Sequence, residues 1–235
     1  MAGQTAQRWP KAALFDLDGT LVDSVPDIAE AVAALLATEG LPPFPVERVR
    51  SMIGRGVRVL VERAFAASGV PLVGGALDAM TARMLTIYPY HLVDRSMAMP
   101  GALLALAQLS MEGCRLAVVT NKPQDFCDTV LRHFAMFDYF DLVLGNQPLE
   151  TGKPLPPKPA PDMLLFALDR LGFAPADAIM VGDSGSDIEA ANAAQVFSVG
   201  VRGGYTESPL EHYKPRLILD TLTDLVARLP TARPT

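Results

Sequence analysis

The chain contains little cysteine and little histidine, which limits the kinds of metal site it can form. Its 235 residues include two cysteines, Cys114 and Cys127, and three histidines. The cysteines are too far apart for a C-x-x-C motif, and no spacing of cysteine and histidine matches a structural zinc site. We therefore expect two free thiols in a reducing compartment, and histidines that belong to the core or the surface.

Positive charge and long apolar runs are also scarce. The 20 lysine and arginine residues are outnumbered by 26 aspartate and glutamate residues, which gives a formal net charge of −6. A nucleic-acid interface would need clustered positive charge, and no apolar run approaches the ~18 residues of a membrane span. Residues 1–10 show no signal-peptide pattern. We expect a soluble, cytoplasmic protein that binds a small molecule, as a monomer or as a homodimer.

Short apolar runs alternate with helical patterns over most of the chain. The apolar runs predict strands at residues 12–15, 116–119, 142–144, 178–181 and 196–201. Helical patterns lie between them, around residues 103–109, 123–134, 163–171, 186–194 and 222–229. Strands that alternate with helices are typical of an α/β fold, in which right-handed crossovers connect the strands of a parallel sheet.

A helical block interrupts this alternation after the first strand. Three amphipathic patterns begin near residues 27, 57 and 77, and no convincing strand lies between them. We expect residues 22–26 to be a linker into this block. The interpretation is a helical cap over residues 23–97, inserted into a core formed by residues 1–22 and 98–235.

Polar residues gather where three of the predicted strands end. These residues are Asp16, Asp18, Thr120, Asn121, Asp183 and Asp187. The carboxyl ends of parallel strands meet at one edge of the sheet, so we expect the six side chains to share a pocket. Neighbouring buried carboxylates need a cation or a shared proton, so both a metal site and an acid/base pair remain open. Oxygen ligands suit a hard cation such as Mg²⁺.

Two lysines compete for the position that balances these carboxylates. Lys153 and Lys158 both lie in a proline-rich connection that follows the strand at 142–144. We favour Lys158, because it directly precedes the helix that leads into the strand at 178–181. Its side chain can then follow the sheet edge into the pocket, whereas the alternative for either lysine is a solvated position in a stiff loop.

Four segments of the chain together resemble the signature motifs of the haloacid dehalogenase-like hydrolase superfamily. The segments are Asp16-Leu17-Asp18-Gly19-Thr20, Thr120-Asn121, Lys158-Pro159, and Gly182-Asp183-Ser184 with Asp187. They occur in the order found in that superfamily, and the insert after the first is similar to its helical C1 cap. The resemblance implies a three-layer, Rossmann-like core with an inserted α-helical cap.

The resemblance also implies roles for the carboxylates. Asp16 would be the nucleophile, which forms an aspartyl-phosphate and also binds Mg²⁺. Asp18 would protonate the leaving alkoxide, activate water in the second step, and bind the metal through its backbone carbonyl. Asp183 would be a further metal ligand, and Asp187 would orient Lys158 or a metal-bound water.

Three further groups would bind the phosphate. By the same resemblance, Thr120, the backbone amide of Asn121 and Lys158 would contact the phosphate oxygens, where charge is spread in the transition state. The acid at Asp18 favours hydrolysis of a phosphate ester over dehalogenation, because a departing halide needs no proton.

Three other segments most resemble phosphoglycolate phosphatases within the superfamily. They are Val119–Pro123, Ile53–Val57 and Gly200–Tyr205. The best single expectation is therefore a phosphomonoester hydrolase acting on 2-phosphoglycolate. Arg55 or Arg58 could meet the carboxylate of such a substrate, and the alternative for both is a solvated arginine at the start of a helix.

Two other functions remain open at this point. A phosphosugar mutase similar to β-phosphoglucomutase would keep both acids, and a sugar-phosphate or pyrophosphate phosphatase would share the same core. A phosphate-binding protein without turnover is the alternative outside enzymes, although every residue proposed for catalysis is present.

Overall fold

A six-stranded parallel sheet forms the centre of the protein. The computed structural model describes residues 9–146 and 154–232, and the sheet has the strand order β5-β4-β1-β6-β7-β8. All five strand pairs are parallel. The strands are β1 (Ala12–Phe15), β4 (Arg115–Pro123), β5 (Leu142–Asn146), β6 (Ala178–Gly182), β7 (Phe197–Val201) and β8 (Leu217–Leu219).

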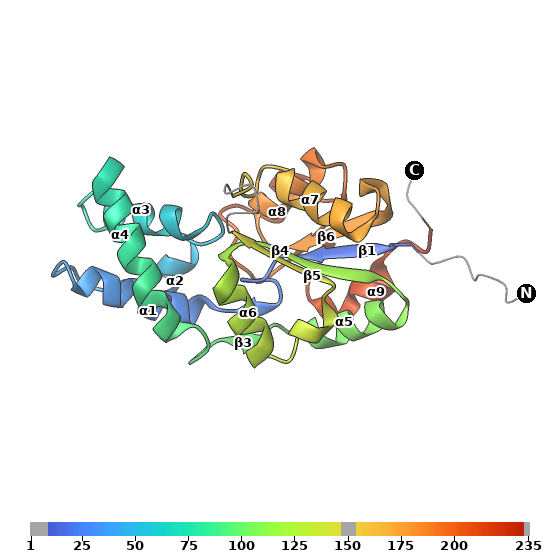
Figure 1. Cartoon of the computed structure of the whole chain (residues 1–235), viewed down its shortest axis with the longest axis horizontal. Helices are drawn as coiled ribbons and strands as arrows, with labels where there is room; N and C mark the ends of the chain where they lie inside the picture. Colours follow the sequence, from blue (N-terminus) through green and yellow to red (C-terminus); the bar gives the residue numbers. More distant parts are fainter. Residues whose placement is uncertain (1–8, 147–153, 233–235) are drawn as a thin grey trace, which may run out of the picture.

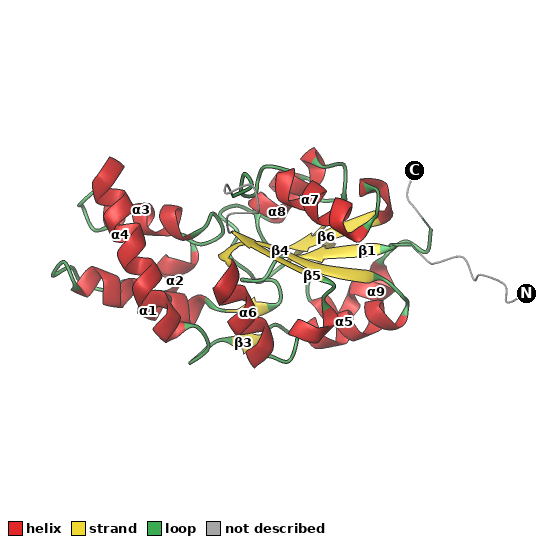
Figure 2. Cartoon of the chain, viewed as in Figure 1, coloured by secondary structure: helices red, strands yellow, loops and turns green. Residues whose placement is uncertain are grey.

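Helices cover both faces of this sheet, so the core has three layers (Figures 1 and 2). In β1, Ala12 and Leu14 pack in the hydrophobic cluster on one face, whereas Ala13 and Phe15 pack in the cluster on the other. Parallel strands buried on both faces read as continuous apolar runs, which explains why the sequence reveals them. The covering helices are α5 (Ala102–Met111), α6 (Gln124–His133), α7 (Asp162–Leu171), α8 (Gly185–Ala193) and α9 (Leu225–Arg228).

A second group of helices follows β1 and stands beyond the carboxyl ends of the central strands (Figure 1). It consists of α1 (Val25–Ala37), α2 (Val46–Arg50), α3 (Val57–Ala67) and α4 (Gly74–Ile87), which pack against one another. The chain enters and leaves the group through a small antiparallel pair, β2 (Val22–Asp23) and β3 (Met97–Ala98). Within the described ranges, no helix has the length and apolar character needed to cross a membrane.

The predicted parallel α/β fold is confirmed, but several short elements differ from the sequence prediction. Residues 22–26, predicted as a linker, contain β2 and the start of α1. Pro26 occupies the first turn of α1, where the missing N–H costs no hydrogen bond. The helix α2 and the strand β8 were not predicted, because five and three residues are too short to show a periodic pattern.

Candidate active site

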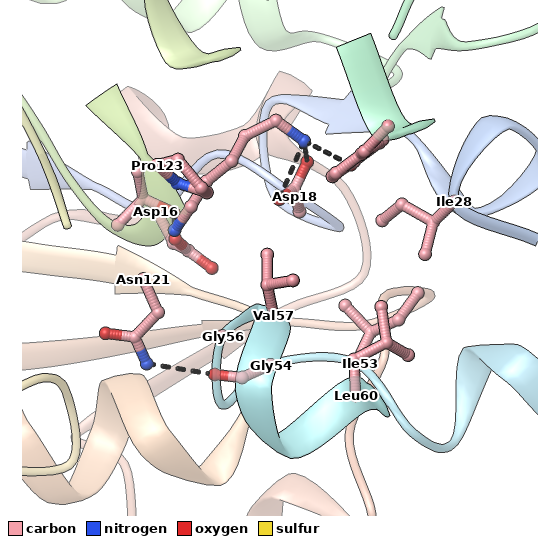
Figure 3. A pocket seen from close by; sticks show the side chains of 13 residues that line it. Asp16, Asp18, Ile28, Ile53, Gly54, Gly56, Val57, Leu60, Asn121 and Pro123 are labelled. Atoms are coloured by element: carbon pink, nitrogen blue, oxygen red, sulfur yellow. Dashed lines mark hydrogen bonds and ion pairs between the residues drawn. The ribbon is translucent and has the colours of Figure 1, made fainter. Parts of the chain in front are cut away.

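A cavity opens at the carboxyl ends of β1 and β4, opposite the helices α1 and α3. Polar groups from the two strands form one wall, and apolar groups from the helical group form the other. Figure 3 shows Asp16 and Asn121 on one side, with Ile28, Ile53 and Leu60 on the opposite side. The position follows from the topology, because ligands of open parallel sheets bind beyond the carboxyl ends of the strands.

Three buried carboxylates meet beside this cavity. Asp16, Asp183 and Asp187, here called the acidic cluster, offer oxygen atoms that all lie within 4.8 Å of one another. The ammonium Nζ of Lys158 lies 2.9 Å from Oδ1 of Asp16 and 2.6 Å from Oδ1 of Asp187, and it donates to the carbonyl oxygen of Val119 at 2.7 Å. Its three N–H groups therefore all have partners. The competing Lys153 lies outside the described residues.

The charges of the acidic cluster are poorly balanced. Burial raises the pKa of Asp16 to about 6, although the ammonium of Lys158 opposes the shift. Burial, followed by repulsion from Asp187 and Asp16, raises the pKa of Asp183 well above its usual range. Burial alone would lower the pKa of Lys158, but the carboxylates of Asp16 and Asp187 raise it above the ordinary value. One permanent cation thus faces three acids, a donor set that fits a hard divalent metal ion.

Asp183 is held in place by hydrogen bonds and by the backbone that packs against its carboxylate. Its Oδ1 accepts a hydrogen bond from Oγ1 of Thr20 at 2.7 Å, and its Oδ2 accepts one from the backbone N–H of Tyr205 at 2.6 Å. Gly19 lies against the carboxylate with φ +88°, and a Cβ atom there would come within 2.5 Å of Oδ2. A glycine is required at this turn for both its conformation and its small size.

Asp187 is held by the start of α8. Oδ2 of Asp187 accepts hydrogen bonds from the backbone N–H of Ser184 at 3.0 Å and from Oγ of Ser184 at 2.7 Å. The two residues form a capping box. The other oxygen of Asp187 is thereby left to contact Lys158. The N-terminus of α8 also favours negative charge at this position.

Asp18 points away from the acidic cluster. Its carboxylate forms an ion pair with Nζ of Lys122, at 2.9 Å from Oδ1 and 3.2 Å from Oδ2, and accepts a hydrogen bond from Oγ of Ser24 at 2.6 Å. Nζ of Lys122 also donates to the hydroxyl of Tyr88 at 2.6 Å. The two acids that follow β1 therefore have different environments, one beside Lys158 and one beside Lys122.

Asn121 connects three segments that are distant in the sequence. Its Nδ2 donates to the carbonyl oxygens of Gly54 at 3.1 Å and Lys158 at 2.9 Å, and its Oδ1 accepts from the backbone N–H of Lys158 at 3.0 Å. Figure 3 shows the contact with Gly54. The side chain thus ties the Lys158 loop and the loop before α3 to β4. Thr120 is buried, and its Oγ1 accepts a hydrogen bond from the backbone N–H of Lys122 at 3.3 Å.

The two arginines proposed for substrate recognition lie outside the cavity wall. Nε of Arg55 lies 3.7 Å from Glu207, and Nη2 of Arg58 lies 3.0 Å from Asp78 of α4. Both side chains are about half exposed. Each guanidinium therefore pairs with a surface acid in this structure, and neither lines the cavity.

Sequence reasoning assigned no role to four residues that support the site. Thr20 and Tyr205 hold Asp183, and Lys122 and Tyr88 form a chain of contacts from Asp18. The cavity is lined by all four residues from Thr120 to Pro123, and the register of β4 against β5 is irregular between Val119 and Pro123. The two-residue period of a strand therefore gives no signal for Lys122.

Tyr205 also reaches the entry to the helical group. Its hydroxyl oxygen accepts hydrogen bonds from the backbone N–H groups of Ser24 at 2.7 Å and Val25 at 3.0 Å, and it donates to Oδ1 of Asp23 at 2.8 Å. Burial raises the pKa of the Tyr205 phenol well above its ordinary value, so the hydroxyl remains a donor. One residue therefore contacts both the first turn of α1 and, through its backbone, the acidic cluster.

The fold and the site agree with the family model of haloacid dehalogenase-like hydrolases, which matches residues 10–195. The match covers most of the chain and includes the acidic cluster, Lys158 and Asn121. The chain belongs to this family.

Similar proteins narrow the comparison further. The chain is 38% identical over 213 residues to a phosphoglycolate phosphatase of Caulobacter vibrioides, covering 90% of this chain and 87% of that protein. It is 39% identical over 225 residues to phosphoglycolate phosphatase 1 of Pseudomonas aeruginosa, covering 94% of this chain and 80% of that protein. A crystal structure of a predicted phosphoglycolate phosphatase from Haemophilus somnus superposes with a TM-score of 0.83 at 32% identity, covering 92% and 96% of the two chains.

Proposed function

We propose that the protein is a Mg²⁺-dependent phosphomonoester hydrolase that acts on a small phosphorylated metabolite, with 2-phosphoglycolate as the best substrate. The observation that carries this proposal is the pair of acids after β1, Asp16 beside Lys158 and Asp18 beside Lys122. Family membership supports a hydrolase, and relatives named phosphoglycolate phosphatase support the substrate.

The proposed reaction uses the two acids in turn. Asp16 attacks phosphorus and forms an aspartyl-phosphate, while the bond from phosphorus to the alcohol oxygen breaks and Asp18 gives that oxygen a proton. Asp18 then takes a proton from water, whose oxygen attacks phosphorus and releases inorganic phosphate from Asp16. Thr120, the backbone amide of Asn121 and Lys158 hold the phosphate oxygens through both steps.

The acidic cluster would hold the magnesium ion. Asp16 and Asp183 of this cluster would supply the carboxylate ligands, and we propose the backbone carbonyl of Asp18 as a further ligand. The ion would offset the repulsion between the carboxylate of Asp16 and the phosphate dianion. Asp187 would position Lys158 through their 2.6 Å contact.

The helical group would act as a cap over this site. We propose residues 23–97 as the cap and residues 1–22 and 98–235 as the core, a division supported by the pairing of β2 with β3 at both crossings. Closure of the cap would exclude water from the phosphate during the first step. A monomer and a homodimer are both compatible with this proposal.

A panel of phosphate esters tests the proposed function directly. With Mg²⁺ present, we expect 2-phosphoglycolate to give a higher kcat/KM than sugar phosphates and pyrophosphate. The measurement is release of inorganic phosphate, with the sugar product analysed in parallel. Isomerised sugar phosphate that forms faster than free phosphate would instead identify a mutase, and tight phosphate binding without turnover would contradict an enzyme.

Thermal melting at two pH values tests the metal site. The pKa of Asp16 is about 6 in the folded protein, against the ordinary value of 3.8 that applies to the unfolded chain. As the pH rises, Asp16 therefore loses its proton at a lower pH in the unfolded chain than in the folded protein. The metal-free protein should therefore lose stability as the pH rises through this range. Magnesium competes with protons for the same carboxylates, so its stabilising effect should be larger at about pH 7.5 than at about pH 5.

We expect Tm to rise by about 5 to 10 °C at about pH 7.5 when Mg²⁺ is ~100-fold above its dissociation constant. Asp183→Asn is the matched control, because it removes one carboxylate from the acidic cluster and should abolish most of this rise. An equal rise in Tm at both pH values, or in the Asp183→Asn variant, would place the metal elsewhere.

A further inference from the structure

Lys122 is a buried cation whose position the proposed reaction leaves unexplained. Its side chain lines the cavity, and the residue is 4% exposed. Among the described residues, Nζ contacts both carboxylate oxygens of Asp18, at 2.9 and 3.2 Å, and the hydroxyl of Tyr88 at 2.6 Å. The hydroxyl oxygen of Tyr88 accepts in this contact, and no described residue accepts a hydrogen bond from its O–H, which is left to donate to a ligand in the cavity.

The charge of Lys122 persists despite its burial. The carboxylate of Asp18 pairs with the ammonium, and the hydroxyl of Tyr88 accepts a hydrogen bond from it, so the buried cation has partners within the protein. The ring of Phe126 packs edge-on against Tyr88, with centroids 5.2 Å apart, and helps to hold the phenol beside the ammonium. The cavity therefore contains an ammonium group next to the acid that would protonate the leaving group, and its positive charge is unbalanced when Asp18 carries that proton.

The cavity wall opposite the two strands has mostly apolar side chains. Ile28, Ile53, Val57 and Leu60 line it and offer no side-chain hydrogen bonds. The hydroxyl groups of a sugar would lose water there without gaining side-chain partners, which is costly. A short leaving group with one anionic end would bury its carbon against these side chains and place its charge at Lys122.

We propose that Lys122 and the hydroxyl of Tyr88 form a carboxylate receptor, which selects short phosphorylated hydroxy acids over neutral esters and sugar phosphates. This inference deepens the proposed function and rests on it for the identity of the reaction. Tyr88 begins the short 3-10 helix Tyr88–His91, which follows α4 of the helical group, and Lys122 lies in β4. The receptor is therefore complete only when the two parts are in contact as they are here. Arg55 and Arg58, which pair with surface acids, are not needed for it.

Two esters that differ only at the anionic end test the receptor. In ethyl phosphate a methyl group replaces the carboxylate of 2-phosphoglycolate. We expect Lys122→Met to lower the ratio of kcat/KM for 2-phosphoglycolate to kcat/KM for ethyl phosphate by about 100-fold, which corresponds to one lost charge-assisted hydrogen bond. Tyr88→Phe keeps the ion pair with Asp18 and should lower the ratio by about 10-fold.

Lys11→Met is the matched control, because Lys11 pairs with Asp177 at the other end of β1. It should leave the ratio unchanged. If Lys122→Met lowered kcat/KM equally for both esters, Lys122 would act only through Asp18, and the proposed receptor would be wrong. A fall of the ratio in Arg55→Ala or Arg58→Ala, with none in Lys122→Met, would also overturn it.

Binding of inert analogues keeps this test independent of turnover. 3-Phosphonopropionate has the shape of 2-phosphoglycolate with a methylene in place of the ester oxygen, and propylphosphonate lacks its carboxylate. Calorimetry should show that the unmodified protein prefers 3-phosphonopropionate and that Lys122→Met loses most of this preference. If the unmodified protein hydrolyses neither ester but shows this preference, the proposed function fails and the receptor stands; if it shows no preference, the receptor fails.

Discussion

Replacement of Asp16 by asparagine is expected to lower kcat by about 10⁴-fold or more, because loss of a nucleophile removes the covalent route. The amide of the new side chain would keep the shape of the carboxylate but could not attack phosphorus. The same change should leave Tm unchanged or raise it, since burial makes ionised Asp16 unfavourable in the metal-free protein. The measurements are phosphate release at a saturating concentration of substrate and thermal melting without metal.

A second buried aspartate provides the matched control for this substitution. Asp27 accepts hydrogen bonds from the backbone N–H groups of Arg95 and Ser96 at 2.9 Å and from Oγ of Ser96 at 2.5 Å. Asp27→Asn should therefore cost about 1 to 3 kcal/mol of stability while the folded protein still turns over. Full activity in Asp16→Asn would remove Asp16 from the mechanism.

Replacement of Lys158 by methionine is expected to harm both stability and turnover. The buried ammonium balances Asp16 and Asp187, so its removal leaves an uncompensated charge that should cost about 3 to 5 kcal/mol. The loss of a preorganised donor to phosphate should lower kcat by at least ~100-fold. Chemical denaturation and steady-state kinetics at saturating Mg²⁺ measure the two effects.

Lys153→Met is the comparison that decides between the two lysines. We expect it to retain activity, because Lys158 already makes the contacts that the acidic cluster requires. A larger loss of kcat in Lys153→Met than in Lys158→Met would contradict this assignment. Mg²⁺ should restore part of the stability that Lys158→Met loses, since a second cation can offset the same carboxylates.

The central strands could be predicted because both of their faces are buried. Ala12–Phe15 and Ala178–Gly182 appear as unbroken apolar runs for this reason. The edge strand Leu217–Leu219 is three residues long, and its place depends on pairing with β7, which no local pattern records. The strand Val22–Asp23 is shorter still and depends on Met97–Ala98, about 75 residues away in the chain.

The same distinction, between local sequence patterns and contacts distant in the chain, applies to the candidate site. Asp16, Asp183 and Lys158 could be placed together because strand ends of a parallel sheet share one edge, and the structure brings their charged groups together. The partner of Asp18 could not be predicted in this way, because the position of Lys122 depends on the hydroxyl of Tyr88 from the helical group. The outward direction of Arg55 likewise depends on Glu207, a residue far along the chain.

Tyr205 contacts both the acidic cluster and the start of the helical group, and this limits which segments can be exchanged between this protein and its relatives. Its backbone N–H restrains Asp183, and its phenol holds the first residues of the helical group. A chimera that replaces residues 23–97 with those of a relative would keep Tyr205 but replace Asp23, whose carboxylate accepts the hydrogen bond from its hydroxyl. Substrate preference should therefore transfer with a grafted helical group only when the segment that contains Tyr205 is grafted with it.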